Sequence, residues 1–247
     1  DLEDVKEIKQ LDEELETVPS IIFKLKPTLL GKGIRVQDLM ILNIIQTNQF
    51  RKPIYFALTV SQDNLINLNE YLRMDGLVYK LVTYKGQELS PPHLKNNLLN
   101  KFRYRNLNRK DVYFNENIKG LLRNYQGAFF NLARFYNKEK MYTGMVEVID
   151  KLFSVMPDTV IPMRHELAFQ FALMYKNAGE TEKASTLLNR IIRRNDTTLD
   201  AKLQYTLYFY RDDQKKAAEM AEKLHQQYPD YANNVYWLAN YYMNQKQ

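Results

Sequence analysis

Residues 127–157 read GAFFNLARFYNKEKMYTGMVEVIDKLFSVMP. Apolar residues recur at helical spacing on both sides of the polar turn NKEK, and Pro157 closes the stretch. This pattern predicts two amphipathic helices joined by a short turn. Similar units follow to the end of the chain. We therefore expect an α+β protein, in which a small α/β module precedes an all-α helical array.

The units after residue 157 repeat at a regular interval. Ala184 and Ala217 lie 33 residues apart, and Ala172 and Ala239 lie 67 apart, which is close to one and two periods of the roughly 34-residue tetratricopeptide repeat. In each unit a small residue lets the second helix approach the first, although Tyr205 stands where a small residue is usual. We predict tetratricopeptide-like helical repeats over residues 113–247.

Stacked repeats of this kind leave a concave groove, lined by the outward positions of each first helix. A groove with several cations would hold an acidic or extended peptide, and the alternative is a set of ordinary solvated helix faces. The repeat register places six candidate peptide-binding residues on this surface: Phe130, Arg134, Asn137, Phe169, Lys176 and Lys202.

Residues 18–112 are expected to form the α/β module and a connector. Apolar, β-rich runs at 21–25, 54–60 and 77–84 alternate with helical patterns at 36–47 and 65–74. Strands that alternate with helices indicate a βαβαβ unit with parallel strands and right-handed crossovers.

The end of the second predicted strand offers another candidate site. Ligands on parallel sheets bind beyond the carboxyl ends of the strands, which would place Thr59, Ser61, Gln62 and Asp63 near a cleft. The alternative is that Ser61 and Asp63 cap the helix that follows.

Charge is unevenly distributed along the chain. The net charge is +6, yet residues 1–17 hold eight acids and two bases, so the rest is strongly basic. We interpret 1–17 as an acidic connecting helix. A basic body can attract nucleic acid, anionic lipid headgroups or acidic proteins, and the alternative is a lysine-rich solvated surface. Bases and aromatics alternate in 101–110, KFRYRNLNRK, but we interpret this run as a surface loop and expect no nucleic acid partner.

The sequence contains no recognisable catalytic constellation. It has no cysteine, and its three histidines, His93, His165 and His225, are scattered, so no metal and no cofactor are expected. No phosphate-binding loop and no nucleophile elbow is present. We expect no enzymatic activity from this chain, which begins at Asp1 and is interpreted as a fragment of a longer protein.

Several blocks of the chain resemble a family of large bacterial multi-spanning membrane proteins, named domain of unknown function 2723. That family is similar to type-C glycosyltransferases and protein O-mannosyltransferases. The chain departs from the family pattern at Lys52-Pro53, where Arg-Pro is usual, and at Asn115-Glu116, where Asp-Glu is usual. The matching blocks are LMILNIIQTNQFRKPIYFALTVS (39–61), LNEYLRMDGLVYKLV (68–82), YFNENIKGLLRNYQGAFFNLARFY (113–136) and VIDKLFSVMP (148–157).

The resemblance implies a soluble carboxyl-terminal region on the periplasmic side of the bacterial inner membrane, attached through amino-terminal spans that this chain lacks. The parent would transfer a sugar from a lipid-linked donor, with catalytic residues in the membrane part, so none is carried over. We expect a non-catalytic domain that binds or orients acceptor polypeptides through the repeat groove. The alternatives are a scaffold for a membrane complex and an enzyme at the strand ends near Thr59 and Asp63.

Overall fold

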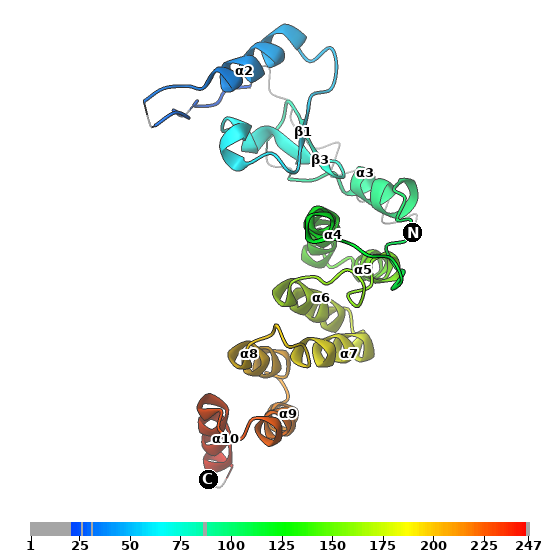
Figure 1. The fold of residues 1–247 in the computed structure, drawn as a ribbon, viewed down its shortest axis with the longest axis vertical. Helices are drawn as coiled ribbons and strands as arrows, with labels where there is room; N and C mark the ends of the chain where they lie inside the picture. The colour runs from blue at the N-terminus through cyan, green and yellow to red at the C-terminus, as the bar shows by residue number, and fades with distance from the viewer. Residues whose placement is uncertain (1–20, 26, 31, 86–87, 246–247) are drawn as a thin grey trace. The chain divides into compact units, whose positions relative to one another are not determined.

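The computed structural model describes residues 21–25, 27–30, 32–85 and 88–245 (Figure 1). The chain divides into two compact units, with the boundary between Pro162 and Met163. The acidic helix expected at 1–17 lies outside the described residues. The domain limits 18–112 and 113–247 remain predictions.

A three-stranded antiparallel sheet lies in the described part of the first unit. Its order is β1 (Tyr55–Ala57), β3 (Val78–Leu81) and β2 (Leu72–Met74), so β3 is central. Tyr79 of β3 lies opposite Phe56 of β1 on one side and opposite Met74 of β2 on the other. The first unit thus contains a small sheet, as expected, but with a different topology.

The predicted parallel βαβαβ arrangement is wrong. Only residues 75–77 link β2 to β3, with the Asp75 amide donating to the Val78 carbonyl at 3.1 Å and Gly76 at a φ of +132°. Such a link forms a hairpin, whereas parallel strands need a crossover of a dozen or more residues. The helix expected over 65–74 is replaced by two 3₁₀ helices, η1 (Gln62–Leu65) and η2 (Asn69–Tyr71), and by β2. A short apolar run does not distinguish these structures.

The strand predicted at 21–25 is also wrong, because this segment joins no ladder in the described part of the chain. The Tyr71 hydroxyl accepts a hydrogen bond from the Ile22 amide at 3.2 Å and donates one to the Ile22 carbonyl at 3.1 Å. Ile21, Phe23 and Leu25 pack against the core, while Ile22 points outward. The Tyr71 side chain therefore satisfies the backbone groups of Ile22, which were expected to pair with a neighbouring strand.

Helix α2 (Val36–Asn48) confirms the helix expected at 36–47. One side of it, formed by Ile41, Leu42 and Ile45, packs on the core of the first unit. That core is a cluster of buried side chains from the sheet and the 3₁₀ helices: Phe56, Leu65, Ile66, Leu68, Tyr71, Leu72 and Leu81.

A short connector leads from the sheet to the helices. Pro91 starts α3 (Pro91–Asn96), where a missing amide costs nothing, and a π-helical turn, η3 (Asn97–Lys101), continues it. Phe102 and Tyr104 each place a ring centroid 5.9 Å from that of Tyr125. The aromatic residues of the 101–110 stretch thus pack against the following helix.

The stretch 127–157 forms a helical hairpin, as predicted. Its helices are α4 (Glu116–Lys138) and α5 (Tyr142–Val155), and the Asn115 side chain caps α4 by accepting from the Ile118 amide at 2.9 Å. A Cβ at Gly144 would lie 3.5 Å from the Tyr136 ring, which shows how closely α5 approaches α4.

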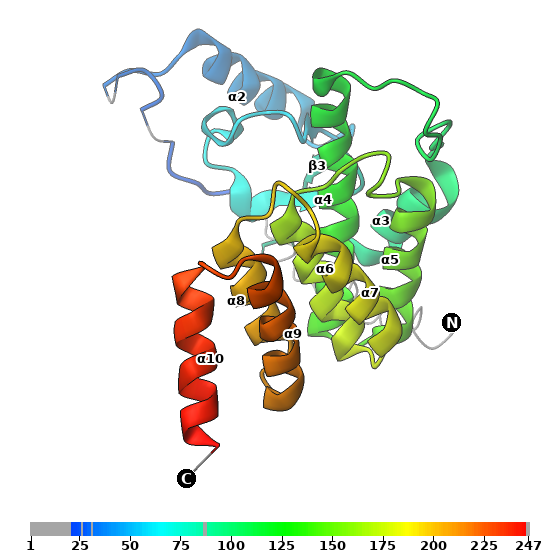
Figure 2. The same cartoon turned by 60° about the horizontal axis from the view of Figure 1, so that its bottom comes forward.

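The second unit is all helical in its described part. Consecutive helices lie against each other (Figure 2). Ala172, Ala184, Ala217 and Ala221 are buried between them. An α+β protein with a carboxyl-terminal helical array is confirmed, and the tetratricopeptide type remains a prediction. The helices of this unit are α6 (His165–Asn177), α7 (Thr181–Ile192), α8 (Leu199–Phe209), α9 (Gln214–Gln227) and α10 (Ala232–Asn244).

Candidate functional site

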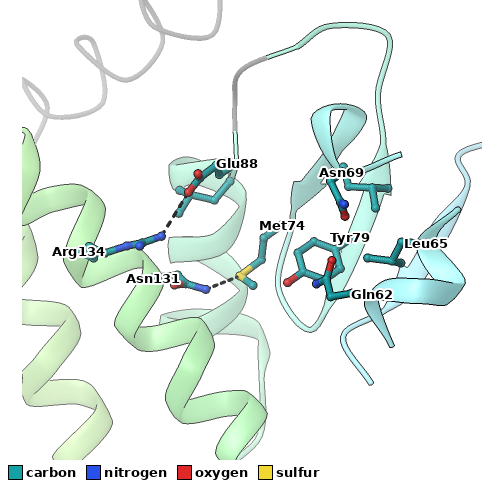
Figure 3. A pocket seen from close by; sticks show the side chains of 10 residues that line it. Gln62, Leu65, Asn69, Met74, Tyr79, Glu88, Asn131 and Arg134 are labelled. Atoms are coloured by element: carbon teal, nitrogen blue, oxygen red, sulfur yellow. Dashed lines mark hydrogen bonds and ion pairs between the residues drawn. The ribbon is translucent and has the colours of Figure 1, made fainter. Parts of the chain in front are cut away.

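A cleft of about 300 Å³ opens in the first unit between the sheet and α4 (Figure 3). Apolar side chains form its floor, and amide and charged side chains form its rim. We call it the α4 cleft. Its lining residues are Gln62, Leu65, Asn69, Leu72, Met74, Tyr79, Glu88, Leu89, Asn131 and Arg134.

Backbone pairing beside β2 builds one wall of the α4 cleft. The Met74 amide donates to the Glu88 carbonyl at 2.9 Å, and the Ser90 amide donates to the Met74 carbonyl at 3.1 Å. Met74 and Leu89 thereby form an isolated parallel bridge. This bridge buries Leu89 in the floor and places Glu88 on the rim.

Helix α4 supplies the opposite wall. Asn131 and Arg134 are three residues apart and therefore lie on the same side of the helix. The Arg134 guanidinium donates to the Glu88 carboxylate at 3.2 Å, as Figure 3 shows. Both side chains are largely exposed, at 55% and 82%, so water screens the pair. Such a pair contributes about 0–1 kcal/mol and can open when another anion competes.

The other polar groups of the α4 cleft are uncharged. The Asn131 amide donates to the Met74 sulfur at 3.6 Å, a weak bond that leaves its carbonyl oxygen to other partners. Burial raises the pKa of Tyr79, and the negative charge of Glu88 raises it further. Tyr79 therefore remains a neutral phenol that can donate a hydrogen bond at neutral pH.

The lining of the α4 cleft contains few charged side chains. Glu88 is the one carboxylate among its described lining residues, and it faces a guanidinium. Three amide side chains and one phenol instead present both donors and acceptors.

A second cleft, of about 400 Å³, lies beside the first and shares Gln62 and Asn69 with it. Arg35 binds the buried Asp38 carboxylate, with distances of 3.0 and 3.2 Å, and donates to the Asp63 carbonyl at 3.2 Å. Thr28 donates a short hydrogen bond to the same carboxylate. The hydrogen bond from Thr28 lowers the pKa of Asp38 most, and the hydrogen bonds from Arg35 lower it further.

The structure separates the four residues of the predicted strand-end site. Asp63 lines the second cleft, whereas Thr59 and Ser61 are exposed and line neither cleft. Ser61 stands at the N-cap position of η1, but its side chain makes no capping hydrogen bond. Gln62, the fourth predicted residue, lines both clefts.

Three of the predicted groove residues lie on α4 in the first unit. Arg134 is exposed and lines the α4 cleft. Phe130 and Asn137 are half-buried and do not line it. Of these three predicted residues, Arg134 is therefore the one placed at a concave surface.

The other three predicted groove residues, in the second unit, are engaged in packing. Phe169 is buried, and its ring stacks on that of Tyr205. Lys176 forms an ion pair with Asp212 at 3.2 Å and also binds the Phe209 carbonyl. Lys202 is buried, with its ammonium 5.3 Å from the Tyr228 ring centroid.

The outward position predicted for Lys202 is thus wrong, because Lys202 is buried and its ammonium lies over Tyr228, the residue that follows α9. Thr206, one turn further along α8, is buried as well, and its hydroxyl donates to the Lys202 carbonyl at 2.8 Å.

The histidines contribute to local structure. Nδ1 of His93 lies 2.7 Å from the Ser90 hydroxyl, and Nδ1 of His165 lies 2.9 Å from that of Tyr205. Among the described residues, no group of three or more His, Asp or Glu side chains is arranged to hold a metal ion.

No helix in the described ranges is long and apolar enough to cross a membrane.

Sequence reasoning missed most of the α4 cleft. Asn131 could have been found from Arg134, because the two are three residues apart on a predicted helix. Glu88 and Met74 could not, because the bridge that joins them connects an irregular segment to a strand that was predicted as helix.

A family model described as TMEM260-associated domain 2 matches residues 1–101. This match suggests a domain related to a membrane protein, and it spans the sheet, α2 and α3. The chain matches no curated protein and no solved structure.

Proposed function

We propose that the chain is a non-catalytic polypeptide-binding region of a membrane glycosyltransferase-like protein related to the domain of unknown function 2723 family. In this proposal it lies on the periplasmic side of the bacterial inner membrane, and its helical array is of the tetratricopeptide type. The bound polypeptide is an acceptor for the sugar. The observation that carries the proposal is the α4 cleft, where Arg134 and three amide side chains surround an apolar floor.

The chemistry of the cleft fits an extended peptide. Each peptide unit offers one N–H donor and one C=O acceptor, and the amides of Gln62, Asn69 and Asn131 can satisfy both kinds of group. Leu72 and Leu89 on the floor would receive an apolar side chain. A volume of about 300 Å³ is at the lower end for ligand pockets, which limits the bound segment to a few residues.

Charge adds selectivity to this picture. Arg134 can leave its exposed pair with Glu88 and bind a carboxylate of the peptide in a two-pronged manner. We therefore centre the binding role on Arg134 rather than on Lys176 and Lys202, which are held within the second unit.

The test is peptide binding by matched charge-reversal variants. Labelled peptides that are rich in Ser and Thr, the acceptor chemistry that O-linked transfer requires, and that carry one acidic residue are titrated against the chain, and fluorescence anisotropy is measured. Arg134→Glu is expected to weaken binding by about tenfold or more. The charged hydrogen bond from Arg134 to the peptide is lost, and the new glutamate places a second negative charge beside Glu88. Arg123→Glu, an exposed arginine on the same helix that does not line the cleft, is the control.

Two results would reject this role for the cleft. One is the absence of binding to any peptide of the set. The other is an equal loss of affinity in Arg134→Glu and Arg123→Glu, which would indicate a general charge effect. Hydrolysis or transfer of a sugar by the isolated chain, lost in Asp63→Asn, would instead favour an enzyme near the predicted strand-end site.

A scaffold for a membrane protein complex is the second candidate. It is favoured by α10, the last described helix, where Val235, Tyr236, Tyr242 and Met243 are exposed. A repeat array buries its faces only against neighbours, so an uncovered apolar end can receive another protein. Crosslinking from Tyr236 in membranes would distinguish the candidates, because a scaffold gives one fixed protein partner that does not depend on Arg134.

A further inference from the structure

Helix α2 has an inverted distribution of polarity. Its one charged residue, Asp38, is fully buried, while Val36, Leu39, Met40 and Ile44 are 73%, 51%, 61% and 55% exposed. The remaining exposed positions of the helix carry only amide or hydroxyl side chains. Solvated helix faces are normally rich in charge, and a contiguous apolar patch marks a contact surface.

We propose that this outer face of α2 docks on an anionic lipid surface. We call it the α2 face and define it by Val36, Leu39, Met40 and Ile44. The inference does not depend on the α4 cleft or on its proposed peptide.

Basic residues bracket the α2 face. Between residues 21 and 62 the sequence has six basic residues and one acidic residue, and Arg35 already neutralises that acid, Asp38. Lys32 before the helix, and Arg51 and Lys52 after it, are exposed and have no carboxylate partner within the described part of the chain. Each base near an anionic membrane surface strengthens binding about fivefold.

An exposed apolar residue accompanies the bases at each end of α2. Leu30 is 91% exposed in a tight turn, where the Lys32 amide donates to the Leu29 carbonyl at 3.0 Å. Phe50 is exposed directly before Arg51. Both Leu30 and Phe50 have positive φ, at 49° and 56°, so these turns are sharp. An apolar tip beside a base suits the boundary between acyl chains and headgroups.

The length and packing of α2 indicate that it would lie along a membrane rather than cross it. Its 13 residues span about 20 Å, whereas the hydrocarbon core is about 30 Å thick. Its inner side is fixed to the core of the first unit by Ile41, Leu42 and Ile45. An ordinary interfacial helix turns a polar face toward water, whereas α2 has its inner side covered by the folded first unit. Figure 1 shows α2 at one edge of this unit.

Charge disfavours a second copy of the chain as the occupant. Two α2 helices that packed antiparallel about a twofold axis would bring Lys32 of one copy near Arg51 and Lys52 of the other. Those bases would repel one another, with no exposed acid on either helix to compensate. An anionic lipid surface can contact both parts at once, because its acyl chains accept the α2 face and its headgroups attract the basic residues at the ends of the helix.

Vesicle binding by the 247-residue chain tests the proposal. We expect co-sedimentation with phosphatidylcholine vesicles that contain phosphatidylglycerol, and little with phosphatidylcholine alone. Arg51→Glu combined with Lys52→Glu should lower the partition coefficient by about 25-fold or more. Met40→Glu should lower it by about tenfold. Met243→Glu, at a methionine of nearly equal exposure on α10 (59%), should leave binding unchanged.

A fluorescence measurement separates insertion from surface adsorption. Trp237 is the one tryptophan of the chain, so Ile44→Trp in a Trp237→Phe background gives a reporter on the α2 face. Brominated acyl chains should quench this reporter, whereas Tyr236→Trp in the same background should not be quenched.

The proposal is overturned by equal binding to both vesicle types, by equal losses in Met40→Glu and Met243→Glu, or by unquenched Ile44→Trp. It is also overturned if size-exclusion chromatography shows a dimer that Met40→Glu dissociates, since the α2 face would then be a contact between copies. Circular dichroism of each variant confirms that the fold is retained, and Leu39→Glu replaces Met40→Glu if that variant unfolds.

Discussion

The ring of Phe169 on α6 stacks on the ring of Tyr205 on α8, with centroids 4.1 Å apart and planes 15° apart. Tyr205 occupies a repeat position where a small residue is usual. The stack explains how a large ring is accommodated there, because it covers Phe169 instead of separating two helices. The Tyr205 hydroxyl also lies 2.9 Å from Nδ1 of His165, so both the ring face and the hydroxyl of Tyr205 have a partner.

This stack should stabilise the second unit beyond the burial of either ring. In a double-mutant cycle, Phe169→Leu and Tyr205→Leu are expected to show a coupling free energy of about 1 kcal/mol, measured by urea unfolding. Phe169→Leu combined with Tyr236→Leu is the control, since Tyr236 is exposed and should show no coupling. Additive effects of Phe169→Leu and Tyr205→Leu would mean that the rings contribute only buried area.

Gly76 should be essential to the β2–β3 hairpin. It has a φ of +132°, and a Cβ there would lie 3.2 Å from the Phe102 ring and 3.3 Å from the Asn97 amide nitrogen. Gly76→Ala is therefore expected to lower the free energy of unfolding by about 1–3 kcal/mol. Gly120→Ala is the matched control, because it meets no atom within 4 Å and lies inside α4. That change should raise stability by up to about 1 kcal/mol.

Asp38 should make stability depend on acid pH. Its hydrogen bond from Thr28 and its contact with Arg35 lower its pKa below the ordinary value of 3.8 for an aspartate. Its contribution to stability is therefore complete above the unfolded-state pKa and is lost as the pH falls through the lower, folded-state pKa.

Thermal unfolding between pH 7 and pH 2 would show this effect. Asp38→Asn should melt at a lower temperature than the wild type at pH 7, and the difference should shrink in strong acid. Asp63→Asn is the control, since Arg35 binds the Asp63 carbonyl and not its carboxylate. A constant difference between Asp38→Asn and the wild type at all pH values would contradict the assignment.

The sequence predicted the long periodic helices well and the sheet poorly, for a physical reason. Helices α2, α4 and α5 carry enough turns for their apolar pattern to be unambiguous. The run at 65–74 is short, and it becomes two 3₁₀ turns and a strand because Tyr71 and Leu72 are drawn into the core. Sheet pairing between distant segments, such as Met74 with Leu89, has no local signal, and the α4 cleft depends on that pairing.

In the helical array, the exposure predicted for a charged residue, Lys202, was wrong. A lysine on a predicted helix face was expected to be solvated, yet Lys202 is buried and places its ammonium over the ring of Tyr228. Arg134, selected by the same register, does reach a cleft. Register alone could not distinguish the two, because the partner of Lys202 is Tyr228, which follows the next helix, α9.

Lys202 should therefore act on stability. Lys202→Glu removes the cation over Tyr228 and buries an acid, so it is expected to cost more than about 2 kcal/mol in urea unfolding. Lys202→Met keeps the packing of the stem and should stay within about 1 kcal/mol of the wild type. Gln204→Glu places the same charge at an exposed position of α8 and should have little effect. If Lys202→Glu were as stable as Gln204→Glu, the ammonium would be free in solution, and Lys202 would again be available to a peptide in the groove.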